Sequence, residues 1–458
     1  MYDKQEDTIV AQATPYGKGG IGILRISGKE IFQIFKKILK KHIKKRYAYY
    51  LPFYDLKGNL IDKGIAIYFS APNSFTGENV LELHGHGGQI SLNLLLRNIL
   101  LIKNIRIAYP GEFSYRSFLN NKMDLIQLES VADLINSNSI TASNMAIKSL
   151  EGLFSKKIHY LINEIQNIRV NIEASLNFPD ENINELSFLK IKNKINNIKD
   201  DIKYIIKQAN QGKKISEGIK IVIIGKPNVG KSSILNALCN QKRAIVTNIP
   251  GTTRDILSES IQIDNISLNL IDTAGIRKNF ENEIEKIGIQ LTYEEIKKAD
   301  HILYVLDAKK NKNSDINKIC YKFQKKIAKN IPFTIILNKI DLLVGDKTKI
   351  YNIKNIDIIK LSIHQNKGIN LLKNYLYKKF KDNISTETVF LARQRHIKNM
   401  IIAFNQLNKI KKLLLDSNTH ELILEELSLA QKKLEEIIGI SYSKNILNDI
   451  FSTFCIGK

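Results

Sequence analysis

The first part of the chain alternates short apolar runs with turn residues. Its apolar runs read DTIVAQATP, GIGILRIS, GIAIYFS and NVLELHGHGG, and segments rich in glycine or containing proline separate them. Short apolar runs between turn residues are typical of β-strands. The pattern therefore predicts an α/β domain over residues 1–120.

A helical pattern follows this domain and returns near the end of the chain. From Leu125 to about Phe178 apolar residues recur at spacings of three and four, and the pattern resumes after Asn383. These spacings place apolar side chains on one face of an α-helix. We expect a discontinuous helical domain with a first part at 121–215 and a second part at 384–458, and we expect the two parts to pack together.

Between the two helical parts, residues 216–383 carry a third pattern. Apolar strands with the sequences IKIVIIG, LNLIDTAG, HILYVLDA and FTIILNKID alternate with helix-like stretches. Such alternation is typical of a parallel sheet with crossover helices. The chain is thus predicted to be a multidomain α/β plus α protein, in which a domain with a mostly parallel sheet is inserted into the helical domain.

Composition supports several domains and leaves the partner open. The chain has 458 residues and a formal net charge of +24. This length suggests roughly two to four domains, and this charge attracts polyanions such as RNA. Heavy use of lysine along the whole chain explains the charge equally well. No arginine-rich cluster with interleaved aromatic residues and no zinc-finger motif decides between the two interpretations.

The sequence shows no sign of export or membrane insertion. Its start lacks a basic segment followed by an apolar core, and no apolar run approaches the length of about 18 residues that spans a bilayer. The cysteines, Cys239, Cys320 and Cys455, are too few and too scattered for a disulfide framework or a zinc site. We expect a cytoplasmic protein that does not associate with membranes.

A phosphate-binding motif follows the strand IKIVIIG. Residues 225–232 read GKPNVGKS and lead into the helical sequence SILNALC, which is the strand–loop–helix context of a P-loop. In this motif backbone N–H groups surround the phosphates, Lys231 neutralises the β- and γ-phosphates, and the Ser232 hydroxyl binds Mg²⁺. Downstream, Thr252 and Thr253 provide a switch-type threonine, and the DTAG sequence that begins at Asp272 provides a magnesium carboxylate and a γ-phosphate-sensing glycine.

The choice of base is predicted from the sequence NKID at 338–341. Asp341 can accept hydrogen bonds from the guanine N1–H and 2-amino groups, which adenine lacks, and a site built for such bonds discriminates by a factor on the order of 10⁴ or more. The tetrapeptide alone is most often a surface turn, but here three motifs occur in the order of a G protein. We predict that the nucleotide is GTP.

The residue that orients the attacking water is not obvious from these motifs. Many GTPases place a glutamine after the DTAG glycine, where this chain has Ile276. The acidic stretch at 281–285 is the nearest local source of a carboxylate, although spacing alone favours an ordinary charged helix start.

The whole chain resembles the family of tRNA-modification GTPases called MnmE or TrmE. The resemblance rests on the strings DTIVAQATPYGKGGIGILRISG, PNSFTGENVLELHGHGG, PGEFSYRSFLNNKMDLIQLESVADLI, IVTNIPGTTRD and IFSTFCIGK. It implies an N-terminal tetrahydrofolate-binding α/β domain that forms a homodimer, a discontinuous helical domain and an inserted G domain.

The resemblance also implies an activity. With a flavin-dependent partner, MnmG (GidA), such proteins install an aminomethyl-type group on C5 of the wobble uridine of certain tRNAs, using a one-carbon unit from a tetrahydrofolate derivative. An alternative is an RNA-binding regulatory GTPase that assists ribosome assembly without a share in covalent chemistry. A third is a scaffold whose GTPase activity only times the docking of a partner. The flanking sequences argue against the ribosome-assembly alternative, because such GTPases lack the folate-like N-terminal domain and the CIGK sequence.

The resemblance assigns roles to residues of the G domain. It implies a K⁺ site formed by Asn228, the carbonyls of Thr247 and Ile249, and Thr252, with Mg²⁺ held by Ser232 and Thr253. It makes Glu285 the water-orienting glutamate, so the catalytic residues are Glu285, Lys231 and Asn228. The loop that usually reads Ser-Ala-Lys near guanine is here Ser362-Ile363-His364. The predicted GTP-binding residues are Asn228, Val229, Gly230, Lys231, Ser232, Ser233, Thr247, Asn248, Ile249, Pro250, Gly251, Thr252, Thr253, Asp272, Thr273, Ala274, Gly275, Asn338, Lys339, Asp341, Ser362 and Ile363.

Outside the G domain the resemblance implies a folate site at Arg25, Glu82, Lys122 and Lys458. From the residues alone, a simple pairing of Arg25 with Glu82 is the favoured explanation of those two. Cys455 is predicted to be a functional thiol of unknown role, with a buried thiol as the alternative. The sequence HGHGG, which contains two histidines, is interpreted as a glycine-rich turn, because no further metal ligands lie at suitable spacing.

Overall fold

The computed structural model of the protein describes a defined set of residues: 7–137, 139–177, 185–239, 258–264, 266–272, 295–310, 318–319, 321, 323, 331–343, 345–353, 355–381, 390–413, 419–441, 447, 450–451 and 457. The chain forms two compact units. The first comprises Met1–Ala132, Ser149–Ile202 and Lys398–Lys458, and the second comprises Asp133–Lys148 and Lys203–Ile397.

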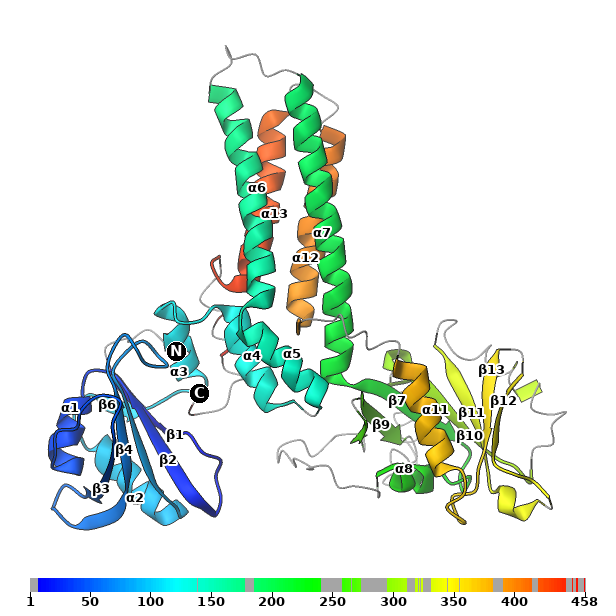
Figure 1. Cartoon of the computed structure of the whole chain (residues 1–458), viewed down its shortest axis with the longest axis horizontal. Helices are drawn as coiled ribbons and strands as arrows, with labels where there is room; N and C mark the ends of the chain where they lie inside the picture. Colours follow the sequence, from blue (N-terminus) through cyan, green and yellow to red (C-terminus); the bar gives the residue numbers. More distant parts are fainter. Residues whose placement is uncertain are drawn as a thin grey trace, which may run out of the picture. The chain divides into compact units, whose positions relative to one another are not determined.

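The N-terminal part of the first unit is built on a six-stranded sheet (Figure 1). The strands have the order β3-β4-β5-β2-β1-β6, and neighbours are antiparallel except for the parallel pair of β1 and β6. Their bounds are β1 (Thr8–Gln12), β2 (Gly19–Ser27), β3 (Ala48–Tyr54), β4 (Leu60–Phe69), β5 (Val80–Gly87) and β6 (Ile105–Ile107).

One face of this sheet is buried, and the other is covered in part, where Ile9 and Ala11 of β1 pack with Phe113. Residues alternate along each strand, so that Leu51 and Phe53 of β3 join Leu81 and Leu83 of β5 in one core, while Arg25 lies on the other face. Helix α1 (Ile31–Ile34), the π-helical turn Phe35–Leu39 and helix α2 (Gln89–Leu100) contribute side chains to the same core. We call the uncovered part of this second face, around Arg25, the open face, and it is available to a ligand or a partner.

Helix α3 (Glu112–Leu119) is fixed to the sheet by buried charges. Arg116 donates to Glu112 at 3.0 Å and to Glu78 at 3.0 Å, and Arg106 donates to Glu112 at 2.6 Å. Burial raises the pKa of the Glu112 carboxyl, but the hydrogen bonds from Arg106 and the Tyr109 N–H, together with the charges of Arg116 and Arg106, outweigh burial, so that the pKa lies below its ordinary value. Each buried charge thus has a partner, as a stable fold requires.

The helical region consists of separate helices rather than one uninterrupted stretch. The predicted region from Leu125 to Phe178 is divided near residues 136–139 and at Gly152, whose φ of 83° is left-handed. Polar Asn and Ser residues at the first break and glycine at the second explain why the helix stops. The helices are α4 (Leu125–Ile135), α5 (Ile140–Leu150), α6 (Leu153–Asn177), α7 (Glu185–Glu217), α12 (Gln394–Leu413) and α13 (His420–Ile438).

Helices that are distant in sequence pack against each other in the first unit. α6 lies along α13 (Figure 1), and Arg169 donates to the Gln431 side-chain oxygen at 3.0 Å. Lys199 of α7 lies over the ring of Phe404 of α12 at 5.9 Å. Each of these helices carries an apolar face, which only a neighbouring helix can bury.

The second unit contains a seven-stranded sheet with the order β12-β13-β11-β10-β7-β9-β8. The central strands β13, β11, β10, β7 and β9 are parallel, and the outer strands β12 and β8 are antiparallel to their neighbours. The bounds are β7 (Ile219–Gly225), β8 (Ser258–Ile263), β9 (Ile266–Asp272), β10 (His301–Asp307), β11 (Phe333–Asn338), β12 (Lys349–Ile353) and β13 (Ile356–Lys360).

Helices α8 (Lys231–Cys239) and α11 (Ile369–Lys381) cover one face of this sheet (Figure 1). The predicted multidomain architecture, with an N-terminal domain, helices and a sheet with parallel strands, is confirmed. The interpretation of HGHGG as a turn is wrong, because His84 and His86 lie in β5, where they bond to Glu82 and Asp62. In the part of the chain that the structure describes, no helix is both long and apolar enough to cross a membrane.

Candidate functional site

The phosphate-binding loop lies between β7 and α8. Gly225 has a φ of 157°, Asn228 of 61° and Gly230 of 98°. A Cβ atom on Gly225 would meet the Val305 carbonyl at 2.4 Å, and one on Gly230 would meet the Asn338 amide nitrogen at 2.3 Å. Close packing and left-handed backbone thus both require glycine there, and they fold the loop into the type of backbone concavity that binds anions.

Lys231 begins α8 and lies across the loop. The side chain is buried, and its ammonium group donates to the Lys226 carbonyl at 3.0 Å. Ser232 follows in the first turn of α8 and is exposed. In the parallel register of β7 and β9, Ile223 pairs with Asp272, so Asp272 lies at the same edge of the sheet as the loop that follows β7. This edge brings together the predicted phosphate and magnesium residues that the structure describes.

Asn338 connects the phosphate-binding loop with the predicted guanine loop. It ends β11 and is buried, its Nδ2 donates to the Val229 carbonyl at 2.9 Å, and its Oδ1 accepts from the Ile363 N–H at 3.2 Å. The Ile363 N–H is therefore engaged by the protein itself. We conclude that Asn338 holds the two loops in register.

Two acidic residues complete this edge. Lys339, with a φ of 68°, donates from its ammonium group to Asp307 at the end of β10, at 3.0 Å. Burial alone would raise the pKa of Asp307, but the bonds from Lys339 and the Lys309 N–H lower it. Asp341 accepts a hydrogen bond from the buried Ser362 hydroxyl, which fixes the carboxylate.

Sequence analysis did not identify Asp307. Its only signal was its place at the end of the strand HILYVLD, because the carboxyl ends of parallel strands meet at one edge. Of the predicted G-domain residues, Thr247, Asn248, Ile249, Pro250, Gly251, Thr252, Thr253, Thr273, Ala274, Gly275 and Glu285 lie outside the described residues. Their roles remain predictions.

The predicted folate residues Arg25 and Glu82 are neighbours on the open face of the N-terminal sheet. They are paired in the register of β2 and β5, and Arg25 Nε donates to Glu82 at 2.9 Å. His84 Nε2 contacts the other carboxylate oxygen at 3.1 Å. The hydrogen bond with His84 and the charge of Arg25 hold the pKa of Glu82 below its ordinary value, although burial opposes them. The alternative that the two residues pair with each other is thus observed, and the pair remains partly exposed.

Residues distant in sequence border this pair. The Arg25 guanidinium lies 5.4 Å from the centre of the Phe75 ring, and its Nη1 lies 3.5 Å from the Gly457 carbonyl. Gly457 has a φ of 92°, and a Cβ atom there would meet the Gln12 carbonyl at 2.4 Å. The backbone at Gly457 therefore packs against β1. Cys455 and Lys458 lie outside the described residues.

Lys122 is exposed and lies near Gly77, and Gly77 follows Phe75 by two residues. The Lys122 Cγ is 3.4 Å from the place where a Cβ of Gly77 would be. The Asn120 amide donates to the Thr76 carbonyl at 2.7 Å, which holds the loop at 75–78 beside this segment. The loop thus connects the surroundings of Arg25 with those of Lys122.

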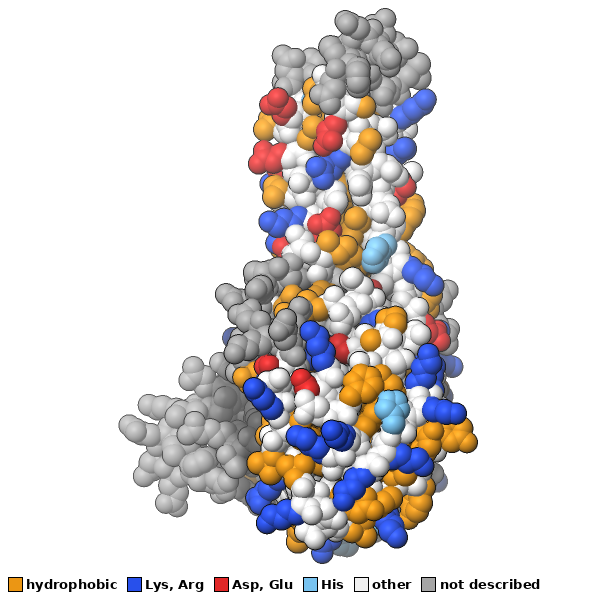
Figure 2. Space-filling view, turned by 90° about the vertical axis from the view of Figure 1, so that its left-hand side faces the viewer, with side chains coloured by type: hydrophobic (Ala, Val, Ile, Leu, Met, Phe, Trp, Pro, Cys, Tyr) orange, Lys and Arg blue, Asp and Glu red, His pale blue; other side chains and the backbone are white. Residues whose placement is uncertain are grey.

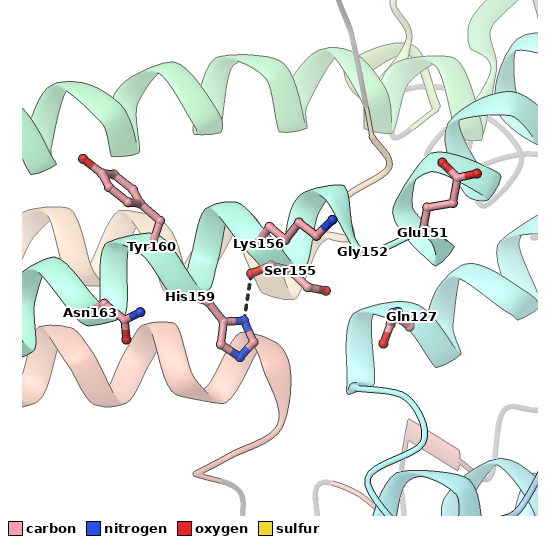
Figure 3. Close-up of a pocket in the computed structure, with 8 residues that line it drawn as sticks. All are labelled: Gln127, Glu151, Gly152, Ser155, Lys156, His159, Tyr160 and Asn163. Carbon is pink, nitrogen blue, oxygen red and sulfur yellow. Dashed lines mark hydrogen bonds between the residues drawn. The ribbon is translucent and has the colours of Figure 1, made fainter. Parts of the chain in front are cut away.

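A separate surface pocket of about 460 Å³ lies between α4 and α6 (Figure 3). Gln127 of α4 and Ser155 and His159 of α6 line it. His159 Nδ1 donates to the Ser155 carbonyl at 2.9 Å, which leaves its Nε2 as an acceptor. The Ser155 hydroxyl is buried and has no hydrogen-bond partner among the described residues. None of the predicted site residues lines this pocket, and sequence analysis could not find it, because its residue types are those of a solvated helix face.

The loop after β7, its lysine and the NKID segment at the same sheet edge define the second unit as a P-loop nucleotide-binding unit of the GTPase class. Family models match most of the chain: the GTP-binding protein TrmE N-terminus matches residues 8–122, and the MnmE helical domain matches residues 125–455. The chain belongs to the MnmE family of tRNA modification GTPases, which confirms the resemblance predicted from the sequence.

The relatives match this chain over nearly its full length. A tRNA modification GTPase MnmE of Actinobacillus pleuropneumoniae serotype 3 is 47% identical and covers 99% of this chain and 100% of its own. The proteins of that name in Pectobacterium carotovorum and Yersinia pestis are 45% identical, each with 99% of both chains covered. The solved G domain of the T. maritima FeoB iron transporter is 21% identical in sequence, and the match covers 35% of this chain and 97% of that one. Its TM-score of 0.25 is too low to establish a shared fold.

Proposed function

We propose that this protein hydrolyses GTP and takes part in modifying tRNA. With a flavin-dependent partner of the MnmG type, it would install an aminomethyl-type group on C5 of the wobble uridine of certain tRNAs in the cytoplasm. The observation that carries the proposal is the Asn338 bridge, which joins a P-loop to a guanine-type NKID segment in a chain whose relatives are named tRNA modification GTPases.

The proposal divides the work among the parts of the chain. Residues 1–120 bind a tetrahydrofolate derivative and form the homodimer, and residues 216–383 form the G domain. The helical parts 121–215 and 384–458 transmit the nucleotide state between them. The open face of the N-terminal sheet and the packing of α6 on α13 are consistent with these roles.

The nucleotide site has the chemistry that GTP and Mg²⁺ need. The loop around Asn228 turns its backbone toward an anion, and Lys231 supplies a buried positive charge for the phosphates. Ser232 would hold Mg²⁺ together with Thr253, and Asp341, fixed by Ser362, would accept the guanine donors. The described residues thus fit a guanine nucleotide.

Hydrolysis requires two further elements. Asn228, with Thr247, Ile249 and Thr252, would hold K⁺, which supplies positive charge near the transferred phosphoryl group. Glu285 would orient the attacking water, since Ile276 offers no hydrogen bond. The left-handed backbone at Asn228 supports this assignment, because it helps to fold the loop into a concavity suited to phosphates.

For folate, Arg25, Glu82, Lys122 and Lys458 would form the site. The side chains of Arg25 and Glu82 keep 22% and 17% of their surface exposed, so a ligand can still reach the pair. A carboxylate and an arginine suit the hydrogen-bonding edge of a pterin, and lysines suit a glutamate tail. Cys455 is proposed as a functional thiol of this segment.

The experiment that tests the proposal is GTP hydrolysis in potassium and in sodium buffer of equal ionic strength. We expect a potassium-specific stimulation of the hydrolysis rate, because the positive charge of K⁺ would take the place of an arginine finger, which raises the rate roughly 10³–10⁵-fold. Asn228→Ala should abolish the difference between the cations. Glu285→Ala should lower the rate in both buffers, whereas Glu281→Ala from the same acidic stretch should not. Equal wild-type rates in both buffers would refute the potassium site.

The folate site is tested by titrating the full-length protein with a formyl-tetrahydrofolate. We expect saturable binding that the double variant Arg25→Met/Glu82→Met loses, since removing both partners leaves no unpaired charge. Lys103→Met, an exposed residue of the same domain, serves as the control. Saturable binding that the double variant retains would show that the pair is structural only.

A further inference from the structure

The N-terminal domain carries a strongly basic segment that the proposed mechanism does not use. Residues 31–54 contain seven Lys or Arg residues and no Asp or Glu. All seven cations are exposed: Lys36, Lys37, Lys40, Lys41, Lys44, Lys45 and Arg46. They lie on the π-helical turn and on the connection that leads into β3, the first strand in the sheet order. We call the exposed residues of segment 36–49 the basic edge.

Figure 2 shows this side of the N-terminal domain. In the lower part of the view, Lys and Arg side chains alternate with hydrophobic ones, and acidic side chains are sparse. A search of the sequence for arginine-rich clusters misses this segment because its cations are almost all lysines.

Aromatic rings are interleaved with the cations of the basic edge. Lys41 Nζ lies 5.3 Å from the centre of the Tyr49 ring, and Lys40 Nζ lies 4.3 Å from that of Tyr54. The Tyr47 and Tyr49 rings are 5.1 Å apart, and Tyr47 is 62% exposed. His42 stacks on Phe32 at 6.1 Å. Cations next to exposed rings are what nucleic-acid-binding surfaces offer to phosphates and unstacked bases.

The connection that carries these side chains is held in place by the backbone. The Arg46 N–H donates to the Tyr68 carbonyl at 2.7 Å, and the backbone of Lys45 forms an isolated parallel β-bridge with that of Tyr68. The Arg46 side chain donates to the backbone carbonyl of Asn73 at 3.0 Å. Because a carbonyl carries no net charge, the positive charge of Arg46 is left uncompensated. The basic edge is therefore a preformed surface, so a ligand need not order it.

A lysine-rich composition does not account for this arrangement. In the G domain, Lys339, Lys360 and Lys379 each pair with an aspartate at 2.9–3.0 Å. Within the described ranges, the seven cations of segment 31–54 make no ion pair. These three lysines are thus neutralised, whereas those of the basic edge are left for a partner with negative charge.

We propose that the basic edge binds tRNA, with its lysines on backbone phosphates and Tyr47 against an unstacked base. The inference rests on the proposed function, because it takes tRNA as the substrate. An acidic protein surface would match the cations, but it seldom combines regularly spaced negative charges with exposed planar rings. tRNA offers regularly spaced phosphates together with loop bases that can stack on tyrosine.

The test is the affinity of the full-length protein for tRNA at several salt concentrations. The triple variant Lys41→Gln/Lys44→Gln/Lys45→Gln removes three cations from the basic edge. We expect the slope of log affinity against log salt to fall by about 2, since each phosphate contact contributes about 0.7–0.9, and the affinity at low salt to fall roughly tenfold or more. The GTP hydrolysis rate without tRNA should not change.

The matched control is Lys190→Gln/Lys194→Gln/Lys207→Gln, which removes three exposed cations from α7. It changes the net charge equally and should leave the salt slope nearly unchanged. Equal losses in the two triple variants would overturn the inference, because binding would then follow net charge alone. Undiminished tRNA binding by the basic-edge variant, or no tRNA binding by the wild type, would overturn it as well.

Two further measurements distinguish a tRNA-binding surface from a protein-binding one. Tyr47→Ala should weaken tRNA binding roughly five- to a hundredfold and Tyr47→Phe should not, because phenylalanine keeps the stacking face. Tyr16→Ala, which removes another exposed tyrosine, is the control. If the basic-edge variant dissociates into monomers in sedimentation, the edge is a subunit interface. If the variant loses flavoprotein binding but keeps its tRNA affinity, the edge is a protein-docking site. Either result overturns the inference. The proposed function fails separately, if the wild type hydrolyses no GTP.

Discussion

Replacing Asn338 by alanine should loosen the phosphate-binding loop in the absence of nucleotide. The Asn338 side chain forms two buried hydrogen bonds, with the Val229 carbonyl at 2.9 Å and the Ile363 N–H at 3.2 Å. Alanine leaves both backbone groups without this partner, and a buried unsatisfied group costs about 1–3 kcal/mol. Two such groups amount to roughly 2–6 kcal/mol, which is a large part of the stability of an ordinary domain.

Amide hydrogen exchange measures this loss where it occurs. Peptides from β7 and β11 of Asn338→Ala should exchange faster by about 30-fold or more, the factor that corresponds to 2 kcal/mol or more of opening free energy. Asn352→Ala is the matched control, because it removes an exposed amide that bonds to Asp357 at 2.9 Å in the same unit, and it should change the opening free energy by less than about 0.5 kcal/mol. Equal exchange in the two variants would refute the view that Asn338 holds the loops in register.

Three other perturbations test buried contacts. Burial lowers the pKa of His301 to about 3 from its ordinary 6.5, so between these two pH values the unfolded chain binds one proton more than the folded chain. Stability is therefore full above pH 6.5, and the free energy of unfolding should be about 2 kcal/mol lower at pH 5 than at pH 8. His301→Gln should remove this difference in thermal unfolding. Gly457→Ala should speed hydrogen exchange in β1, because the new Cβ would meet the Gln12 carbonyl at 2.4 Å. Arg116→Ala should destabilise the N-terminal domain to urea by about 3–5 kcal/mol, because it breaks the buried ion pair with Glu112 and the ion pair with Glu78, although Arg106 still binds Glu112.

Each of these three perturbations has a matched control. His364→Gln removes an exposed histidine of the same unit and should keep the pH dependence. Gly345→Ala imposes a left-handed alanine in open space, so it separates backbone strain from the steric contact. Lys103→Ala removes an exposed cation of the N-terminal domain. An Arg116→Ala midpoint that matches that of Lys103→Ala would contradict the importance of the buried charges.

The sequence predicted those elements whose pattern is local. IKIVIIG was predicted as a strand and forms β7, because a central parallel strand is apolar on both faces. β3 was not predicted, because it is an edge strand whose alternate residues face solvent, so it lacks a continuous apolar run. Pro52 within it and the lysines before it also do not fit a typical strand pattern. The break at Gly152 was also missed, although glycine in a left-handed conformation commonly ends a helix.

The site was predictable as a set of motifs but not as a set of contacts. The P-loop and NKID residues were found because each motif is contiguous. The bond between Asn338 and Val229 joins residues 109 positions apart, and it follows from strand order, which periodicity does not reveal. Asp307 was missed for the same reason, and the Tyr rings beside lysines of the basic edge became meaningful only when their distances were known.

The contact between Arg25 and Gly457 has a consequence for how the N-terminal site comes into being. The two residues are 432 positions apart, so a ribosome must synthesise the helices and the whole G domain before this neighbour of Arg25 exists. The N-terminal sheet can fold early, but its site is finished late. Formation of this contact therefore requires that the helices and the G domain have already been made.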